Sequence, residues 1–176
     1  MNVFNVHERR LLTSPEDAWR LIANLGGKHD LLWPQHWPRM RFDRPLGLGA
    51  IGGHGFIGYY VEQYSPPELI RFRFTSPRGY DGYHEFRIVQ EIGSLKFRHT
   101  LRMRTHGMTT WLWILVLKPL HDALVEDLMD CASTYSSNHT FSSHWPLRVR
   151  FLRWLLGRLS PPPAQRSPSA PIKTSR

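Results

Sequence analysis

Hydrophobic and polar residues alternate along four long stretches in the middle of the chain. Residues 54–64, 68–75, 82–92 and 95–106 show this alternation, and glycine, proline and serine lie between them, which is typical of antiparallel strands joined by tight turns. Residues 3–12 predict a further strand at the start of the chain. The pattern therefore predicts a sheet with one apolar face and one polar face.

The turn at Gly93-Ser94 allows the register of the last two strands to be predicted. If these two residues form the hairpin loop, Ile92 lies opposite Leu95 and the other pairs follow by counting. The inner pairs are then Gln90–Phe97, Ile88–His99, Phe86–Leu101 and His84–Met103. The outer face receives opposite charges such as Glu91 and Lys96, and a slip by one residue would turn the apolar set outward.

A second turn, Ser65-Pro66-Pro67-Glu68, joins the first two long strands. It predicts the inner pairs Val61–Phe72 and Tyr59–Phe74 and an outer contact between Glu62 and Arg71. Five arginines then share the outer face, namely Arg71, Arg73, Arg98, Arg102 and Arg104. A solvated sheet surface is the simpler interpretation, because the aromatic residues that would stack on nucleic-acid bases point mostly to the other face.

Two helices are predicted around the sheet. The first begins at Ser14 and Pro15, a capping residue followed by proline, and ends at Gly26-Gly27. A short helical or irregular segment, residues 28–37, follows it. The second covers residues 117–134, with an apolar stripe made of Leu117, Leu120, Leu124, Leu128, Cys131 and Tyr135. The acidic residues of this helix are expected to form a solvated face, and they are Asp122, Glu126, Asp127 and Asp130.

The composition changes after residue 134, where we place the end of the main domain, residues 1–134. Residues 135–144 predict a polar linker, residues 145–159 a basic amphipathic helix, and residues 160–176, rich in proline and serine, a disordered tail. The helix 145–159 has two interpretations. Its high apolar content favours packing on the rest of the protein, and docking on an anionic membrane surface is the alternative.

The charge of the chain is concentrated in this C-terminal region. The 176 residues suffice for one domain, and their net charge is +9. Residues 145–176 contain seven basic residues and no acidic residue, so residues 1–144 carry only +2. Nucleic-acid binding by the main domain is therefore not favoured.

Short apolar runs and a single cysteine exclude several classes. The longest apolar run, residues 111–117, has seven residues, whereas a membrane-spanning helix needs about 20. The first residues lack a basic segment followed by an apolar stretch, so we expect no secretory signal and a cytoplasmic protein. Cys131 alone cannot form an intramolecular disulfide or a cysteine-rich zinc site.

Three histidines are predicted on inner faces: His84 and His99 in the sheet and His121 on the apolar flank of the long helix. The predicted register separates the Cα atoms of His84 and His99 by about 13 Å, and no acidic residue is predicted inward nearby, so we expect no metal site. The histidines either satisfy hydrogen bonds in the core or provide the polar points of an apolar ligand pocket.

The inner face is also rich in aromatic residues. An ordinary core and the lining of a cavity between a curved sheet and the long helix are both compatible with this pattern. The residues concerned are Tyr59, Phe72, Phe74, Phe86 and Phe97, followed after the last strand by Trp111 and Trp113.

The order strand, helix, curved antiparallel sheet and long C-terminal helix is a helix-grip arrangement. Over residues 2–134 the sequence resembles the START-like (SRPBCC) superfamily, in particular its polyketide cyclase/dehydrase-like branch. The segments that carry the resemblance are Tyr64–Phe72, Gly82–Phe86, Arg98–Thr100 and Pro119–Leu128. The resemblance implies an α+β fold with a cavity between the sheet and the long helix for a hydrophobic small molecule or a lipid. It does not supply catalytic residues.

We therefore expect a carrier or sensor that binds a hydrophobic small molecule or lipid, without a cofactor. The residues expected to line its cavity are Tyr59, Phe72, Phe74, His84, Phe86, Phe97, His99, Leu101, His121, Leu124 and Leu128. One alternative is a cyclase/aromatase-like enzyme in which an inner histidine or Tyr59 acts as general acid or base. Another is a lipid carrier that the helix 145–159 anchors to a membrane.

Overall fold

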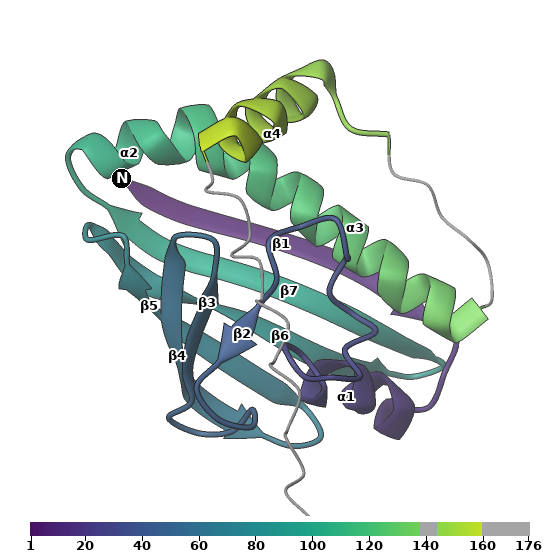
Figure 1. Cartoon of the computed structure of the whole chain (residues 1–176). Helices are drawn as coiled ribbons and strands as arrows, with labels where there is room; N and C mark the ends of the chain where they lie inside the picture. The colour runs from purple at the N-terminus through teal and green to yellow at the C-terminus, as the bar shows by residue number, and fades with distance from the viewer. Residues whose placement is uncertain (138–143, 160–176) are drawn as a thin grey trace, which may run out of the picture.

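A curved, seven-stranded antiparallel sheet lies beneath one long helix (Figure 1). The computed structural model describes residues 1–137 and 144–159. The strands are β1 (Asn2–Leu11), β2 (Arg41–Phe42), β3 (Ile51–His54), β4 (Ile57–Ser65), β5 (Leu69–Ser76), β6 (Tyr80–Glu91) and β7 (Ser94–Thr105), in the sheet order β1-β7-β6-β5-β4-β3-β2. The helices are α1 (Pro15–Ala23), α2 (Met108–Leu112), the π-helical turn η1 (Trp113–Leu117), α3 (Lys118–Ser137) and α4 (Leu147–Leu159). This architecture confirms the predicted α+β helix-grip fold.

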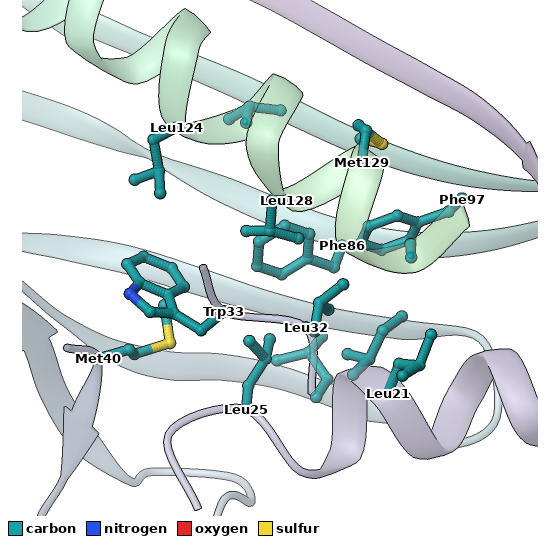
Figure 2. Close-up of a cluster of buried hydrophobic side chains, with 14 of the residues drawn as sticks. Leu21, Leu25, Leu32, Trp33, Met40, Phe86, Phe97, Leu124, Leu128 and Met129 are labelled. Atoms are coloured by element: carbon teal, nitrogen blue, oxygen red, sulfur yellow. The ribbon is translucent and has the colours of Figure 1, made fainter. Parts of the chain in front are cut away.

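Helix α1 begins where the sequence predicts it. The Ser14 side chain accepts a hydrogen bond of 3.1 Å from the backbone N–H of Asp17, and Pro15 occupies the first helical position, where no N–H is required. The helix ends at Ala23, and Gly26 follows with a φ of +70°. The helix buries Leu21 and Ile22 in the main core. Figure 2 shows Leu21 at the lower side of this core.

The predicted register of the β6–β7 hairpin is wrong by two residues. Glu91 pairs with Ser94, so the loop consists of Ile92 and Gly93. Gly93 has a φ of +74° at the second loop position, in the left-handed region that glycine adopts without steric cost. The faces of the strands stay as predicted, because a shift by an even number of residues preserves them. The partners change, and His99 lies opposite Phe86 and not opposite Ile88.

The β4–β5 register confirms the two predicted inner pairs, Val61–Phe72 and Tyr59–Phe74. The predicted outer contact between Glu62 and Arg71 is wrong, because the register shifts between Val61 and Gln63. Glu62 instead pairs with Arg73 at 2.5 Å, and Arg71 pairs with Glu85 of β6 at 2.7 Å. The Arg73–Glu62 pair is partly exposed, as expected of a solvated outer face, whereas Glu85 is buried.

Residues 47–55, directly before β4, are rich in glycine. They contain β3, a strand that the sequence pattern did not predict. It pairs with both β2 and β4, so its backbone is approached closely on each side. A Cβ atom on Gly52 would lie 2.2 Å from the carbonyl oxygen of Arg41, and one on Gly53 would lie 2.2 Å from that of Ile57. Only glycine fits at these positions. The predicted strand 54–64 accordingly divides into the end of β3 and β4.

The long helix starts earlier than predicted and contains a wider turn. Helix α2, the π-helical turn η1 and α3 follow one another from Met108 to Ser137. The turn ends two residues before Pro119. In a regular α-helix the ring of Pro119 would clash with the carbonyl of Leu115, and Pro119 has no N–H to donate to that carbonyl. The Leu115 carbonyl accepts a hydrogen bond of 2.8 Å from Nη2 of Arg148 in α4.

Helix α3 crosses the concave face of the sheet and packs its leucines into the core (Figure 2). Leu120, Leu124 and Leu128 are buried as predicted. The predicted stripe fails at its C-terminal end, where Cys131 is half-buried and Tyr135 is exposed. The helix also continues to Ser137, so part of the predicted linker 135–144 is helical; residues 138–143 lie outside the described residues.

The expected solvated face of α3 is wrong. Its acidic residues Asp122, Glu126 and Asp130 face the edge strand β1, where they contact Asn5, His7 and Arg9 at 3.2, 2.6 and 3.0 Å respectively. Asp127 points to the other side of the helix and is only 3% exposed. Side chains of β1 thus hold the helix to the sheet edge, which the period of the helix alone does not reveal.

Helix α4 packs on the rest of the protein, the favoured one of its two interpretations. Val149 and Leu152 are buried within the main core, and Trp145 packs against it. Figure 1 shows α4 beside α3 and close to α2. The predicted disordered tail, residues 160–176, lies outside the described residues. Within the described part, no helix is long and apolar enough to cross a membrane.

Candidate ligand cavity

A cavity of about 830 Å³ lies between the sheet and α3. This volume is in the range of natural small-molecule sites, and the lining is predominantly apolar. Helix α3 supplies Leu120, Leu124, Val125 and Leu128, and strand β7 supplies Leu101 and Met103. Figure 1 shows α3 along the β1 and β7 side of the sheet, from which the other strands curve away.

Eight of the eleven residues expected at the cavity line it. They are Phe74, His84, Phe86, His99, Leu101, His121, Leu124 and Leu128. The other three, Tyr59, Phe72 and Phe97, are fully buried in the packed core and do not reach the cavity. Their position on the inner face was predicted correctly. What excludes them is the packing of Phe42 and Phe86 against their rings, which strand alternation cannot indicate.

Several wall residues come from segments that strand and helix periodicity did not single out. Trp33, His36 and Trp37 come from the irregular loop after α1, and His54 to Ile57 come from the turn between β3 and β4. Arg153 and Leu156 of α4 complete the wall. The only local signal was the aromatic composition of the segment Trp33-Pro34-Gln35-His36-Trp37.

The three inner histidines lie together. The ring centroids of His84 and His99 are 5.6 Å apart, and those of His99 and His121 are 5.1 Å apart. His7, on β1 directly opposite His99, adds a fourth ring 6.2 Å from His121. The distance argument against a metal site depended on the wrong hairpin register, and the corrected register removes it.

Four histidines of the wall, His54, His84, His99 and His121, have pKa values lowered by burial, which favours the neutral form near pH 7. Burial lowers the pKa of His54 to about 4 and holds the pKa values of His84 and His99 well below the ordinary value, because charge is costly away from water. Burial also lowers the pKa of His121, although its contact with Asp122 opposes the shift. A neutral imidazole has one donor nitrogen and one acceptor nitrogen, so each of these rings can serve a ligand either way.

Polar atoms without a protein partner occur in the same wall. Among the described residues, His84 Nε2, His99 Nδ1 and the hydroxyl of Tyr80 are buried and make no hydrogen bond. All three residues line the cavity. Burial raises the pKa of Tyr80 to about 12, so its hydroxyl stays protonated. Tyr59, by contrast, shares a hydrogen bond of 3.2 Å with His54 Nδ1.

Asp127 joins the α4 side of the wall to α3. Its Oδ2 atom accepts hydrogen bonds from His36 Nε2 at 2.9 Å, Trp37 Nε1 at 2.7 Å and Trp145 Nε1 at 3.1 Å. The guanidinium of Arg153 lies over both the Trp37 and the Trp145 ring, 4.2 and 4.1 Å from their centroids, and donates to the carbonyl oxygen of His36 at 2.7 Å. This group of residues holds α4 against the loop that lines the cavity.

No family model matches the chain, and no curated protein matches its sequence. Solved structures do resemble it in fold. CalU16 from Micromonospora echinospora is 12% identical with a TM-score of 0.56, and the match covers 89% of this chain and 84% of that one.

Two further likenesses cover a smaller share of this chain. Truncated norcoclaurine synthase from Thalictrum flavum is 14% identical with a TM-score of 0.60, covering 80% of this chain and 96% of that one. The Aha1 dimer from Colwellia psychrerythraea is 14% identical with a TM-score of 0.53, covering 74% and 96%. Identities this low concern the fold and do not distinguish the polyketide cyclase/dehydrase-like branch from the others. The chain therefore shares the helix-grip fold of these solved structures.

Proposed function

We propose that this protein binds a hydrophobic small molecule or lipid in the cavity between the sheet and α3, as a carrier or sensor. The observation that carries the proposal is the chemistry of the wall. Apolar side chains dominate it, and among its polar groups His84 Nε2, His99 Nδ1 and the Tyr80 hydroxyl are buried without a hydrogen-bond partner. A mostly apolar ligand with one or two oxygen or nitrogen atoms matches such a lining.

The ligand is oriented by hydrogen bonds and held by burial. His84 and His99 offer nitrogen atoms on neighbouring strands, and Tyr80 offers a hydroxyl near Trp113. Leaving such buried polar atoms unpaired costs about 1–3 kcal/mol each, so a ligand that pairs with them gains affinity. A purely aliphatic ligand would leave this cost in place and is expected to bind less tightly.

Mass spectrometry of an organic extract of the purified full chain tests the proposal. We expect a stoichiometric hydrophobic compound, and the fluorescent dye 1-anilinonaphthalene-8-sulfonate should compete with it. Leu124→Trp fills the cavity from α3 and should abolish both signals. Leu12→Trp, at an exposed position outside the cavity, is the matched control. If the extract is empty and dye binding is the same in both variants, the cavity is not a binding site.

An enzyme of the cyclase/aromatase type is the second candidate, and the neutral wall histidines favour it. A neutral imidazole with an unpaired nitrogen, such as His99 or His84, can take or give a proton at a carbonyl substrate. Norcoclaurine synthase, with the same fold, has also been solved as a point mutant in complex with a transition-state analogue. Tyr59 is a weaker candidate for this role than predicted, because it does not line the cavity.

The variant His99→Ala separates the carrier from the enzyme. Loss of turnover of the extracted compound with retained binding would favour the enzyme, and loss of affinity alone would favour the carrier. Ser133→Ala, which removes a buried hydroxyl of α3 that does not line the cavity, controls for a general effect of buried truncation.

Membrane contact through α4 is supported by its outward side. Leu147, Phe151 and Trp154 are exposed there, and the neighbouring arginines include Arg148 and Arg150. Two exposed apolar residues of η1, Ile114 and Leu115, lie beside α4. Arg148 of α4 donates to the carbonyl oxygens of both. Apolar side chains flanked by arginine are typical of helices that lie on anionic membrane surfaces.

The double variant Phe151→Glu/Trp154→Glu tests this contact without opening the cavity, since neither residue lines it. Deleting residues 145–176 would also remove Arg153 and Leu156 from the wall, so the double variant is the sharper test. We expect the intact chain to sediment with phosphatidylserine-containing liposomes and the variant to stay in the supernatant. Equal sedimentation of both would remove α4 as the anchor.

A further inference from the structure

The contact between β1 and α3 holds a group of side chains of the kinds that bind metal ions. His7 points from β1 toward α3, and His121 and Asp122 are neighbours on α3. One ligand atom from each of the three lies within 4.8 Å of the others. His7 was not among the candidate residues of the sequence, because only the strand pairing of β1 with β7 brings it opposite His99 and under the helix.

The distances are close to those of a coordination sphere. Asp122 Oδ1 lies 3.6 Å from His7 Nε2 and 3.3 Å from His121 Nδ1. Ligand atoms bound to one tetrahedral Zn²⁺ at about 2.0–2.1 Å lie about 3.4 Å from one another. The two pairs that include Asp122 already meet this spacing, and a small rotation of the imidazoles closes the third.

The surrounding residues orient the three side chains as outer-shell partners orient metal ligands. Glu126 Oε1 lies 2.6 Å from Nδ1 of His7, so the Nδ1 proton is donated to the carboxylate and the lone pair is left on Nε2, the atom that faces Asp122. Lys118 Nζ donates to Oδ2 of Asp122 at 2.6 Å, which leaves Oδ1 for the histidines. A carboxylate behind the histidine and a hydrogen bond to the ligating carboxylate are both present.

Unpaired polar atoms gather at the same place. Among the described residues, His7 Nε2, His121 Nε2 and Asn5 Oδ1 are buried and lack a hydrogen-bond partner, and all three residues contact Asp122. Buried polar atoms rarely stay unpaired in folded proteins, and an ion bound between the three side chains would satisfy His7 Nε2. The local charge also suits a cation, because the three carboxylates of Asp122, Glu126 and Asp130 contact just two Lys or Arg side chains among the described residues, Arg9 and Lys118.

We propose that His7, His121 and Asp122 bind a divalent transition-metal ion, with Zn²⁺ as the ion to test first. His7 binds through Nε2, Asp122 through Oδ1 and His121 through Nδ1. Two imidazoles and one carboxylate suit Zn²⁺ and neighbouring first-row metals, and they do not suit Mg²⁺ or Ca²⁺, which take oxygen ligands. Three protein ligands leave one tetrahedral position for water or another small ligand.

The site lies beside the cavity, since His121 belongs to both. With Nδ1 on the metal, the proton of His121 sits on Nε2, which makes this nitrogen a fixed hydrogen-bond donor. The ion thus fixes β1 to α3 and sets the protonation of one wall residue. This inference does not depend on the proposed ligand, because the metal can bind whether or not the cavity is filled.

Zn²⁺ titration of the EDTA-treated full chain, by calorimetry with a competing chelator, tests the proposal. We expect one tight site. His7→Ala, His121→Ala and Asp122→Asn should each weaken it at least 100-fold, and Glu126→Gln should weaken it about 10- to 100-fold as an outer-shell partner. His29→Ala and His106→Ala, which remove exposed histidines, should leave it unchanged.

Folding is checked separately, because His7 and His121 also pack between β1 and α3. Circular dichroism in EDTA must show each variant folded, and Asp122→Asn, the isosteric change, carries the test if an alanine variant fails. Co²⁺ in place of Zn²⁺ should give a visible absorption spectrum that Asp122→Asn abolishes and excess Mg²⁺ does not alter. The proposal is overturned if Zn²⁺ binds the intact chain no more tightly than folded Asp122→Asn, or if the exposed-histidine controls weaken binding equally.

Discussion

Asp127 shows what a single buried charge does in this fold. Its carboxylate is almost fully removed from water and accepts hydrogen bonds from one histidine and two tryptophans, which come from the loop after α1 and the segment before α4. Hydrogen bonds to a charged group contribute about 1.5–3 kcal/mol each, and they offset the cost of burying the charge. The residue therefore connects α3 to both of these segments.

Asp127→Asn should destabilise the protein by about 2–3 kcal/mol. The amide keeps the shape, but its NH₂ group places a donor against the indole donors of Trp37 and Trp145. Urea unfolding followed by tryptophan fluorescence measures the change. Asp81→Asn, at an exposed ion pair with Arg73, is the control and should change stability by less than about 0.5 kcal/mol. Equal effects of the two variants would contradict the role of Asp127.

At the scale of secondary-structure elements, α4 is part of the cavity wall and not an appendage. Its inner side buries Val149 and Leu152, and its Arg153 and Leu156 line the cavity. The sequence predicted the start of α4 within two residues. Because the predicted helix is imperfectly amphipathic, the sequence did not decide between packing on the protein and docking on a membrane. The structure shows that it packs through one side and leaves Phe151 and Trp154 exposed on the other.

Val149→Asp should release α4 from α3 while the sheet and α3 stay folded. The side chain is only 3% exposed, so the new carboxylate is either buried without a partner or freed by detachment of the helix. Limited trypsin digestion should then cut more readily after Arg148, Arg150 or Arg153, with an unchanged far-ultraviolet circular dichroism spectrum apart from the lost helix. Phe151→Asp, which is 58% exposed on the same helix, should leave the digestion pattern as in the parent. An unchanged rate for Val149→Asp would mean that other contacts hold α4.

At the scale of the whole molecule, the cavity combines a large hydrophobic lining with several neutral histidines. A folded protein that keeps histidines uncharged becomes less stable in acid, because the unfolded chain takes up protons that the native state does not. The cavity thus provides polar atoms for a ligand at neutral pH, and it makes the fold sensitive to mild acid.

The free energy of unfolding should fall as the pH decreases from about 6.5 to about 4. His54 has a native pKa of about 4 against an ordinary value near 6.5, so the stability that it contributes is complete above 6.5 and is lost as the pH falls through this window. Each such histidine contributes up to about 1.4 kcal/mol per pH unit. His84, with a pKa also well below the ordinary value, adds to the same slope. Urea titrations across this range measure the effect.

His54→Gln is the variant that tests the assignment. Glutamine does not titrate and can still bond to the Tyr59 hydroxyl, so the pH slope should decrease while stability near pH 7 changes little. His29→Gln, at an exposed histidine, should leave the slope unchanged. If the slope is the same in His54→Gln and the parent, His54 does not carry the acid sensitivity.

The candidate site was predictable in part. Alternation along the strands placed His84, Phe86, His99 and Leu101 on the inner face, and helical period placed Leu124 and Leu128 opposite them. Which of the inward-facing side chains reach the cavity, and which are covered by other side chains, was not predictable. Tyr59, Phe72 and Phe97 share the same face but are covered by neighbouring rings, and no local pattern reports that covering.

Local sequence patterns sufficed to predict which residues face inward, where α1 begins and that one long helix pairs with an antiparallel sheet. These features depend on short-range physics: the period of two in strands, the period of 3.6 in helices and the geometry of capping. Tertiary packing alone set the β6–β7 register, the pairing of β1 with the acidic side of α3, the wall residues of the loop after α1 and the place of α4. Each of these depends on which distant segments of the chain meet. In the β6–β7 pair, a register shift of two residues leaves every side chain on its predicted face of the sheet but gives it a different cross-strand partner. The cavity and the histidine–aspartate group beside it are therefore consequences of that long-range packing.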